Sequence, residues 1–273
     1  MRQNLRKLTH YILGKIWFAM RKPPYIFHFS GLRRSGNHAC INWLANSIYG
    51  RKVKYKQLDH YLFRQFPENK IFFINSYAQE SALKVFRYMF KYRRQIRDCD
   101  YLFLSLEDES LQFKHFIHSK MDQSFSFSIH INRSLFNMLS SRSKKISVDT
   151  AKEGGGIANN FNVEEKLIEG LFAYRRSDLL QWEYDEWLVN PEWRNSFLGF
   201  VGLSEDIMPS MSVEAGGSSF DTDNKEGLNN AGRTRYKMQT IPNEWLSIIE
   251  EKYIDQLSTE EVEQLKEIRA LVK

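Results

Sequence analysis

The stretch with the clearest capacity for chemistry lies near the start of the chain, where four residues separate Gly31 from Gly36. This G-x-x-x-x-G spacing is typical of a loop that wraps around a phosphate group. An apolar, β-prone run (25–29) precedes the loop and a run with helical spacing follows it, which predicts the order strand, loop, helix. Backbone N–H groups at the start of such a helix, together with its dipole, favour an anion. The stretch therefore predicts an anion site, and the competing interpretation is an ordinary surface turn.

The residues in and after this loop differ from those of an ATP-binding P-loop. In that loop a Lys and a Ser or Thr follow the last glycine, and the hydroxyl binds Mg²⁺. Here Asn37 and His38 take those places, and the positive charge lies inside the loop at Arg33 and Arg34. We therefore expect phosphate binding with no metal ion, and no Cys and His spacing in the chain suggests a zinc site.

Three other stretches carry polar or basic residues at the end of a predicted strand or after a loop. Arg133 ends a strand-like run, and Ser141 follows eight residues later in a predicted helix. A guanidinium group can donate two aligned hydrogen bonds to a phosphate. Tyr184 ends another strand-like run, and Arg233 and Arg235 follow a Gly- and Ser-rich segment. For each residue the alternative is a surface arginine, a helix serine or a core tyrosine.

The loop sequence Arg-Arg-Ser-Gly-Asn-His (33–38) resembles the first nucleotide-binding motif of sulfotransferases, which use 3′-phosphoadenosine-5′-phosphosulfate (PAPS). Arg34, Ser35 and Gly36 match the Lys/Arg-Ser-Gly of that family, whereas Asn37-His38 replaces its pair of hydroxyl residues. Later stretches are similar in the same order. The run 133–141 keeps the Arg and the Ser of the second family motif without its Asp-Pro. The run 184–202 is similar to a Tyr-Glu-Asp stretch followed by Asn-Pro and a Phe-Leu-Gly helix.

The resemblance implies a role for each matched residue. The loop 33–38 would bind the 5′-phosphosulfate, and Arg133 and Ser141 would contact the 3′-phosphate. Tyr184 would lie near the adenine. A late basic segment closes the 3′-phosphate site in this family, and Arg233 or Arg235 would do so here. The resemblance spans about residues 25 to 240.

The general base is expected at the end of a predicted strand, 101–106. The family usually has a His there, and in some branches a Glu. Here the strand is followed by Glu107 and Asp108, and a carboxylate beside an apolar strand end can serve as a base because burial raises its pKa. Glu107 is the first candidate, followed by Asp108 and then His38. Arg34 and helix N–H groups would stabilise the charge that builds up during transfer.

Strand-like and helix-like runs alternate along the chain, which predicts an α/β protein. With the resemblance, the expected architecture is a three-layer P-loop fold with a mostly parallel central sheet flanked by helices. Ligands bind such sheets at the carboxyl ends of the strands. The expected strands are 25–29, 70–75, 101–106, 124–131 and 179–184. The expected helices are 80–97, 134–142, 163–177, 243–253 and 259–272, with a turn and a short helix in 186–203 that bury Phe197, Phe200 and Val201. Residues 51–69 are expected to be irregular.

The composition of the 273-residue chain is that of a globular protein with a net charge of +6. Two cysteines are too few for a disulfide framework, which indicates a reducing, cytoplasmic location. Residues 1–24 are predicted to form a basic amphipathic helix that ends at Pro23-Pro24, separate from the main domain, 25–273. This helix would either pack on the domain or lie on an anionic membrane surface as a peripheral contact.

These observations predict an enzyme that transfers the sulfuryl group of PAPS to a hydroxyl or amine of a carbohydrate or glycolipid. One alternative is a P-loop kinase with a degenerate loop. Another is an inactive nucleotide-binding scaffold. A nucleic-acid binder is disfavoured, because acidic clusters at 107–109, 183–186 and 250–265 interrupt the basic residues.

Overall fold

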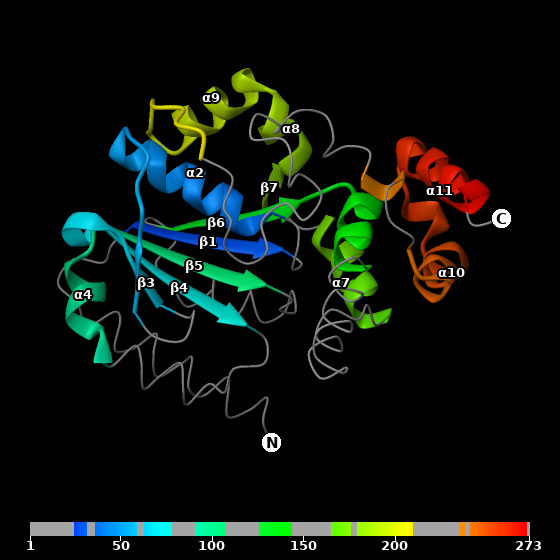
Figure 1. Cartoon of the computed structure of the whole chain (residues 1–273), viewed down its shortest axis with the longest axis horizontal. Coiled ribbons are helices and arrows are strands. Elements are labelled where there is room, and N and C mark those ends of the chain that lie inside the picture. Colours follow the sequence, from blue (N-terminus) through cyan, green and yellow to red (C-terminus); the bar gives the residue numbers. More distant parts are fainter. Residues whose placement is uncertain are drawn as a thin grey trace.

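The structure is a computed structural model that describes residues 25–31, 36–58, 63–77, 91–107, 126–143, 165–175, 179–209, 235–237 and 241–271 (Figure 1). Several predictions fall outside these residues and are not tested by the structure. They concern the helix in 1–24, the first part of the helix in 80–97, and the side chains of Arg33, Arg34, Ser35, Glu107, Asp108, Arg233 and Arg235.

Seven strands form one sheet in the described part of the chain, in the order β2-β3-β4-β5-β1-β6-β7. The strands are β1 (Tyr25–Gly31), β2 (Lys56–Gln57), β3 (Phe63–Gln65), β4 (Ile71–Tyr77), β5 (Tyr101–Glu107), β6 (Ser126–Asn132) and β7 (Leu180–Glu183). Strands β4, β5, β1, β6 and β7 pair in parallel, while β2 and β3 form an antiparallel edge. The prediction of an α/β protein with a mostly parallel sheet is therefore confirmed.

The antiparallel edge corrects the expectation that residues 51–69 are irregular. Strands β2 and β3 are too short to show an alternating pattern of their own. They form because β3 pairs with β4, with Arg64 opposite Phe73 and Phe63 opposite Ile74. Such pairing depends on the partner strand, so the side-chain pattern of residues 51–69 alone does not display it.

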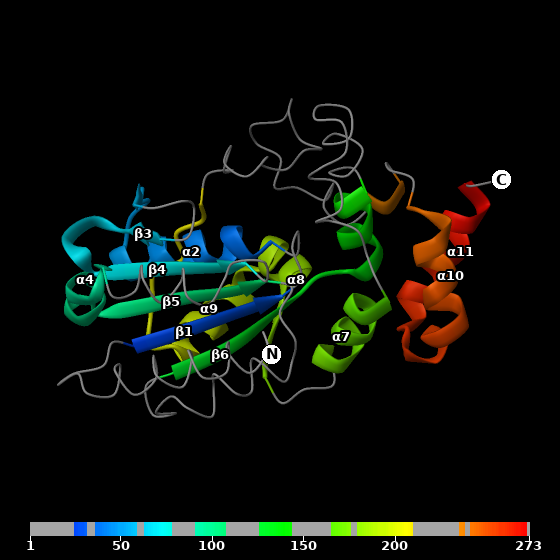
Figure 2. The ribbon, with the colours of Figure 1, turned by 90° about the horizontal axis from the view of Figure 1, so that it is seen from below.

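Helices lie on both faces of the sheet (Figure 1). They are α2 (Asn37–Tyr49), α4 (Arg93–Asp98), α7 (Glu165–Arg175), α8 (Tyr184–Val189), α9 (Pro191–Phe200), α10 (Asn243–Lys252) and α11 (Thr259–Leu271), and residues 135–143 are also helical. Short 3₁₀ helices are η1 (Pro67–Asn69), η5 (Arg235–Lys237) and η6 (Ile254–Gln256). Helices α2, α8 and α9 cover one face, and α4 lies on the other. Figure 2 shows α7, α10 and α11 beyond the ends to which the parallel strands point. None of the helices in these ranges is long and apolar enough to cross a membrane.

The alternation of side chains along β1 explains the two packed faces. Phe27 and Phe29 point into a core with Trp43 of α2, whereas Ile26 points into a second core with Ile96 of α4. A third cluster joins residues 135–143 to α7, α10 and α11. Burial of these apolar side chains is the main stabilising contribution to the fold.

The stretch 186–203 forms more helix than expected. Acidic residues in the first turn of α8 favour its positive end, and the Asn190 side chain caps α9 by accepting from the N–H groups of Glu192 and Trp193. Phe197 is buried as predicted. The expectation for Phe200 was wrong, because its side chain is 64% exposed and only one edge of the ring meets Phe127. It lies on the outer side of an amphipathic helix.

Helix α11 is tied to α7 at its first turn. Ser258 accepts a hydrogen bond from the N–H of Glu261, and the Glu261 carboxylate accepts from the N–H of Ser258, which is a capping box. The same carboxylate accepts two hydrogen bonds from Arg175, at 2.7 and 3.0 Å. Burial alone raises the pKa of Glu261, but the hydrogen bonds and charge of Arg175 together with the bonds to Ser258 outweigh it, and the pKa is lowered.

Glu261→Gln is expected to reduce the free energy of unfolding by about 1–3 kcal/mol at pH 7, because it removes the partner of a partly buried Arg175. The ordinary pKa of the carboxyl is 4.5. Since the folded-state pKa is lower, the stabilisation is complete above that value and is lost as the pH falls through the folded-state pKa. Urea denaturation at pH 7 and pH 4 measures this difference. Glu263→Gln breaks only an exposed pair with Lys266 and should cost less than about 0.5 kcal/mol. An equal loss of stability in Glu261→Gln and Glu263→Gln would contradict the inference that the Arg175–Glu261 pair holds α11 against α7.

Candidate functional site

The expected site residues follow parallel strands whose carboxyl ends lie together at one end of the sheet. Gly31, where the loop begins, is in register with Glu107, and Glu107 is in register with Tyr77. On the other side of β1, Asn132 is in register with Glu183. The backbone of Glu107, the first candidate for the base, therefore lies directly beside the start of the loop.

The last loop residue has the backbone geometry that requires glycine. Gly36 caps α2 with a φ of +101°, in the left-handed region that L side chains rarely adopt. A Cβ atom placed on Gly36 would overlap Cε2 and Cδ2 of the Tyr184 ring. The ring of Tyr184 thus packs directly on the backbone at the entrance to α2.

Arg133 completes this arrangement. It follows β6, is 5% exposed, and its Cζ lies 5.0 Å from the centre of the Tyr184 ring. A guanidinium over an aromatic face is held in place by cation–π attraction. Gly36, Tyr184 and Arg133, which come from three stretches far apart in the sequence, therefore form one contact group, the Gly36–Tyr184–Arg133 cluster.

Two further predicted site residues, Ser141 and Arg235, are connected through one helix. Ser141 is buried in the helix over residues 135–143, one turn after Asn137. Asn137 accepts a hydrogen bond from the N–H of Tyr236 at 3.2 Å. Tyr236 follows Arg235 in η5, so the backbone of Arg235 is anchored on the helix that carries Ser141. Sequence reasoning missed Asn137, because no motif distinguishes it from other helix residues.

The first residues of α2 face two different surroundings. Asn37 is buried. His38 lies with its Nδ1 3.5 Å from Nη1 of Arg64, and its ring meets the Phe73 ring edge-on. Sequence reasoning also missed Arg64, because it falls in the segment expected to be irregular.

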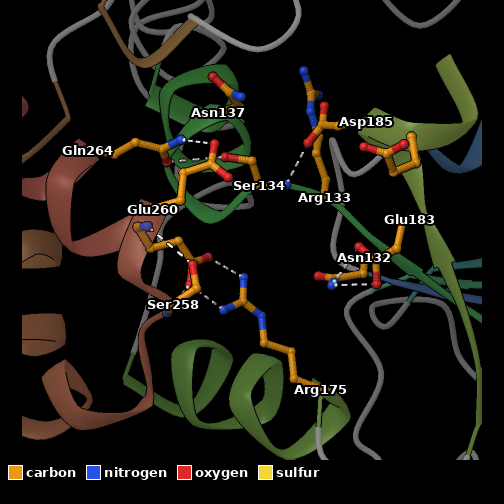
Figure 3. Close-up of a pocket in the computed structure, with 12 residues that line it drawn as sticks. Asn132, Arg133, Ser134, Asn137, Arg175, Glu183, Asp185, Ser258, Glu260 and Gln264 are labelled. Carbon is orange, nitrogen blue, oxygen red and sulfur yellow. Dashed lines mark hydrogen bonds and ion pairs between the residues drawn. The ribbon is translucent and has the colours of Figure 1, made fainter. Parts of the chain in front are cut away.

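A pocket of about 450 Å³ opens between the ends of β6 and β7 and the first turn of α11 (Figure 3). Its lining residues are Asn132, Arg133, Ser134, Asn137, Arg175, Glu183, Asp185, Glu186, Ser258, Glu260, Glu261 and Gln264. Five of these are acidic and two are arginines. This excess of negative charge disfavours an anion among the carboxylates of the pocket, and Arg133 is the lining residue that also belongs to the Gly36–Tyr184–Arg133 cluster.

Several polar groups that line the pocket form hydrogen bonds with one another. Asn132 donates from Nδ2 to both carboxylate oxygens of Glu183, at 3.2 and 3.1 Å. Burial raises the pKa of Glu183, and the bond from Asn132 opposes that shift. Asp185 accepts from the N–H of Ser134 at 3.0 Å and so ties the start of α8 to the end of β6. These contacts position Arg133, which lies between Asn132 and Ser134 in the chain. In the residues that the structure covers, no group of three or more His, Cys, Asp or Glu side chains could hold a metal ion.

The fold and the site together define an α/β protein with a candidate anion site at the carboxyl edge of a mostly parallel sheet. No protein-family model matches the chain, and no curated protein matches it significantly.

Proposed function

We propose that the protein is a PAPS-dependent sulfotransferase with a three-layer P-loop fold. The observation that carries the proposal is the Gly36–Tyr184–Arg133 cluster. Each member comes from a different stretch that resembles a sulfotransferase motif, and the three meet at the ligand-binding edge of the sheet. The ring of Tyr184 also lies against both Gly36 and Arg133, a contact that the adjacency of the three strands does not by itself require.

In the proposed complex each part of the nucleotide has a distinct partner. The loop 33–38 and the start of α2 bind the 5′-phosphosulfate through backbone N–H groups, the helix dipole and the loop arginines. Arg133 and Ser141 bind the 3′-phosphate, and Tyr184 lies near the adenine. Arg235, or Arg233 before it, closes the 3′-phosphate site, and the anchoring of η5 on Asn137 supports this placement.

The proposed reaction is an in-line displacement at sulfur. The acceptor oxygen, or amine nitrogen, attacks the sulfur while the bond from sulfur to the 5′-phosphate oxygen breaks. Glu107 takes the proton of the acceptor, with Asp108 and His38 as the other candidates. Arg34 and the N–H groups of α2 stabilise the charge that develops on the leaving phosphate. The products are a sulfated acceptor and 3′,5′-adenosine bisphosphate (PAP).

The acceptor that we propose is a carbohydrate or a glycolipid, and the proposed location is the cytoplasm. Contact of residues 1–24 with an anionic membrane surface would bring the enzyme to a lipid-linked acceptor. No nucleic acid and no metal ion take part in the proposed reaction.

The test is a thermal-shift and calorimetric titration with PAP, run beside ATP with Mg²⁺. At 100 times its Kd, PAP should add about 2.7 kcal/mol of stability, a rise of roughly 5 °C or more in Tm for a domain of this size. Arg133→Ala should weaken PAP binding about 10- to 100-fold, because it removes charge-assisted hydrogen bonds to phosphate. Arg97→Ala is the matched control, since Arg97 is exposed on α4 and pairs with Asp98; its affinity for PAP should be unchanged.

Two other outcomes would replace the proposal. A response to ATP that requires Mg²⁺, without a response to PAP, would place the protein among P-loop kinases with a degenerate loop. The absence of any response would leave an inactive scaffold as the better interpretation.

A further inference from the structure

Arg64 is a buried cation near the start of α2 that the proposed function does not use. It lies on β3 and is 5% exposed. Its guanidinium lies over two aromatic rings, with Cζ 4.4 Å from the centre of the Tyr55 ring and 5.3 Å from that of Phe73. Stacked in this way, the planar group has a fixed orientation.

Within the described part of the chain, no carboxylate forms an ion pair with Arg64, and its Nε has no hydrogen-bond partner there. A buried charge without a counter-charge is costly, because the protein interior solvates it poorly. The aromatic faces of Tyr55 and Phe73 recover only part of that cost. Arg194, another buried arginine, shows the usual solution, since its Nε lies 2.8 Å from a carboxylate oxygen of Asp206.

A second source of positive potential, the N-terminal end of α2, lies beside Arg64. Its Nη1 lies 3.5 Å from Nδ1 of His38, the second residue of α2, so the guanidinium lies at the positive end of a 13-residue helix. The first turn of α2 contains no acidic residue that could offset it. A buried guanidinium and a helix N-terminus thus come together without an anion from the described residues, and both favour an anion from outside.

We propose that Arg64 and the first turn of α2 form a subsite for a tetrahedral oxyanion, a sulfate or a phosphate group. The planar fork of Arg64, held by Tyr55 and Phe73, would donate hydrogen bonds to two of its oxygens. If the proposed function holds, the group has two sources. It is either the sulfuryl group of the donor or an anionic group that the acceptor already carries.

The first arm of the experiment tests the subsite alone, on the full-length protein. Inorganic sulfate is titrated at constant ionic strength against chloride, with Tm as the readout. Arg64→Gln should raise the Kd for sulfate roughly tenfold or more, and Arg64→Lys, which keeps the charge but loses the fork, should fall between it and the wild type. Arg51→Gln is the control, because Arg51 is exposed and pairs with Glu68; it removes the same charge and should leave the Kd unchanged.

The second arm distinguishes the two sources. If Arg64 holds the donor's sulfuryl group, Arg64→Gln weakens PAPS roughly tenfold more than PAP, which lacks that group. If Arg64 holds an anion of the acceptor, the variant affects PAPS and PAP equally, and sulfate still stabilises the PAP-saturated wild type but not the PAP-saturated variant.

The subsite is overturned if the wild type does not respond to sulfate or phosphate. It is also overturned if Arg64→Gln and Arg64→Lys lower the Tm but respond to sulfate as the wild type does, which would leave Arg64 a packing role. Should Arg64→Gln fail to fold by circular dichroism, the Arg64→Lys titration carries the test. If the protein binds sulfate through Arg64 but does not bind PAP, the proposed subsite stands and the proposed sulfotransferase function is wrong.

Discussion

Gly36→Ala is expected to cost about 2–5 kcal/mol of stability and to abolish binding of PAP. The new Cβ would overlap the Tyr184 ring, and the residue would have to keep a φ of +101°. Overpacking of a tight contact costs typically 1–3 kcal/mol, and a left-handed backbone conformation adds about 1–2 kcal/mol. Relief of the overlap would move Tyr184 and, with it, Arg133. Urea denaturation measures the loss of stability, and calorimetry measures the loss of binding.

Gly199→Ala is the matched control for this substitution. Gly199 lies in α9, and a Cβ there would meet nothing within 4 Å. Since alanine is the better helix former, the change should leave stability unchanged or raise it by up to about 1 kcal/mol.

A double-mutant cycle isolates the contact between the loop and the ring. Tyr184→Ala removes the ring that the new Cβ meets. The double variant Gly36→Ala/Tyr184→Ala should therefore lose at least about 1 kcal/mol less stability than the sum of the two single variants. Strict additivity would show that the ring and the loop do not meet in the folded protein.

The second large effect concerns the proposed base. Glu107→Gln should lower kcat for sulfuryl transfer by about 10²-fold or more, because the amide cannot take up the acceptor proton. The affinity for PAP should not change. Because Glu107 is in register with Gly31 at the start of the loop, its backbone lies beside the proposed phosphosulfate site. Release of PAP from PAPS, measured against a panel of carbohydrate and glycolipid acceptors, reports the rate. The variant should also lose the acid limb of the pH dependence of kcat/KM.

The same measurement tests Asp108 and His38, the other candidates for the base. Asp108→Asn and His38→Gln should each reduce kcat by less than Glu107→Gln. If Glu107→Gln retains full activity while Asp108→Asn or His38→Gln does not, the base is reassigned and the fold and nucleotide site are unaffected.

Local patterns in the chain were enough to predict the elements that carry the site. Apolar runs of five or six residues predicted strands at β1, β4 and β5, an alternating run (124–131) predicted β6, and the G-x-x-x-x-G spacing placed a helix start after Gly36. These features depend on near neighbours in the sequence, on side-chain periodicity and on the backbone freedom of glycine, so a sequence displays them directly. The order of strands and helices then favoured a parallel sheet with ligands at its carboxyl edge.

Contacts between one element and another could not be predicted in this way. Strand β3 exists through its pairing with β4 and β2 through its pairing with β3, and the buried position of Arg64 follows from this arrangement. The anchoring of Tyr236 on Asn137 and the outward position of Phe200 likewise depend on how helices settle on the sheet. The meeting of Gly36, Tyr184 and Arg133 is of the same kind. Residue types and spacing suggested all three, but only the packed sheet brings them within contact, because side-chain packing across strands acts between residues that the sequence keeps far apart.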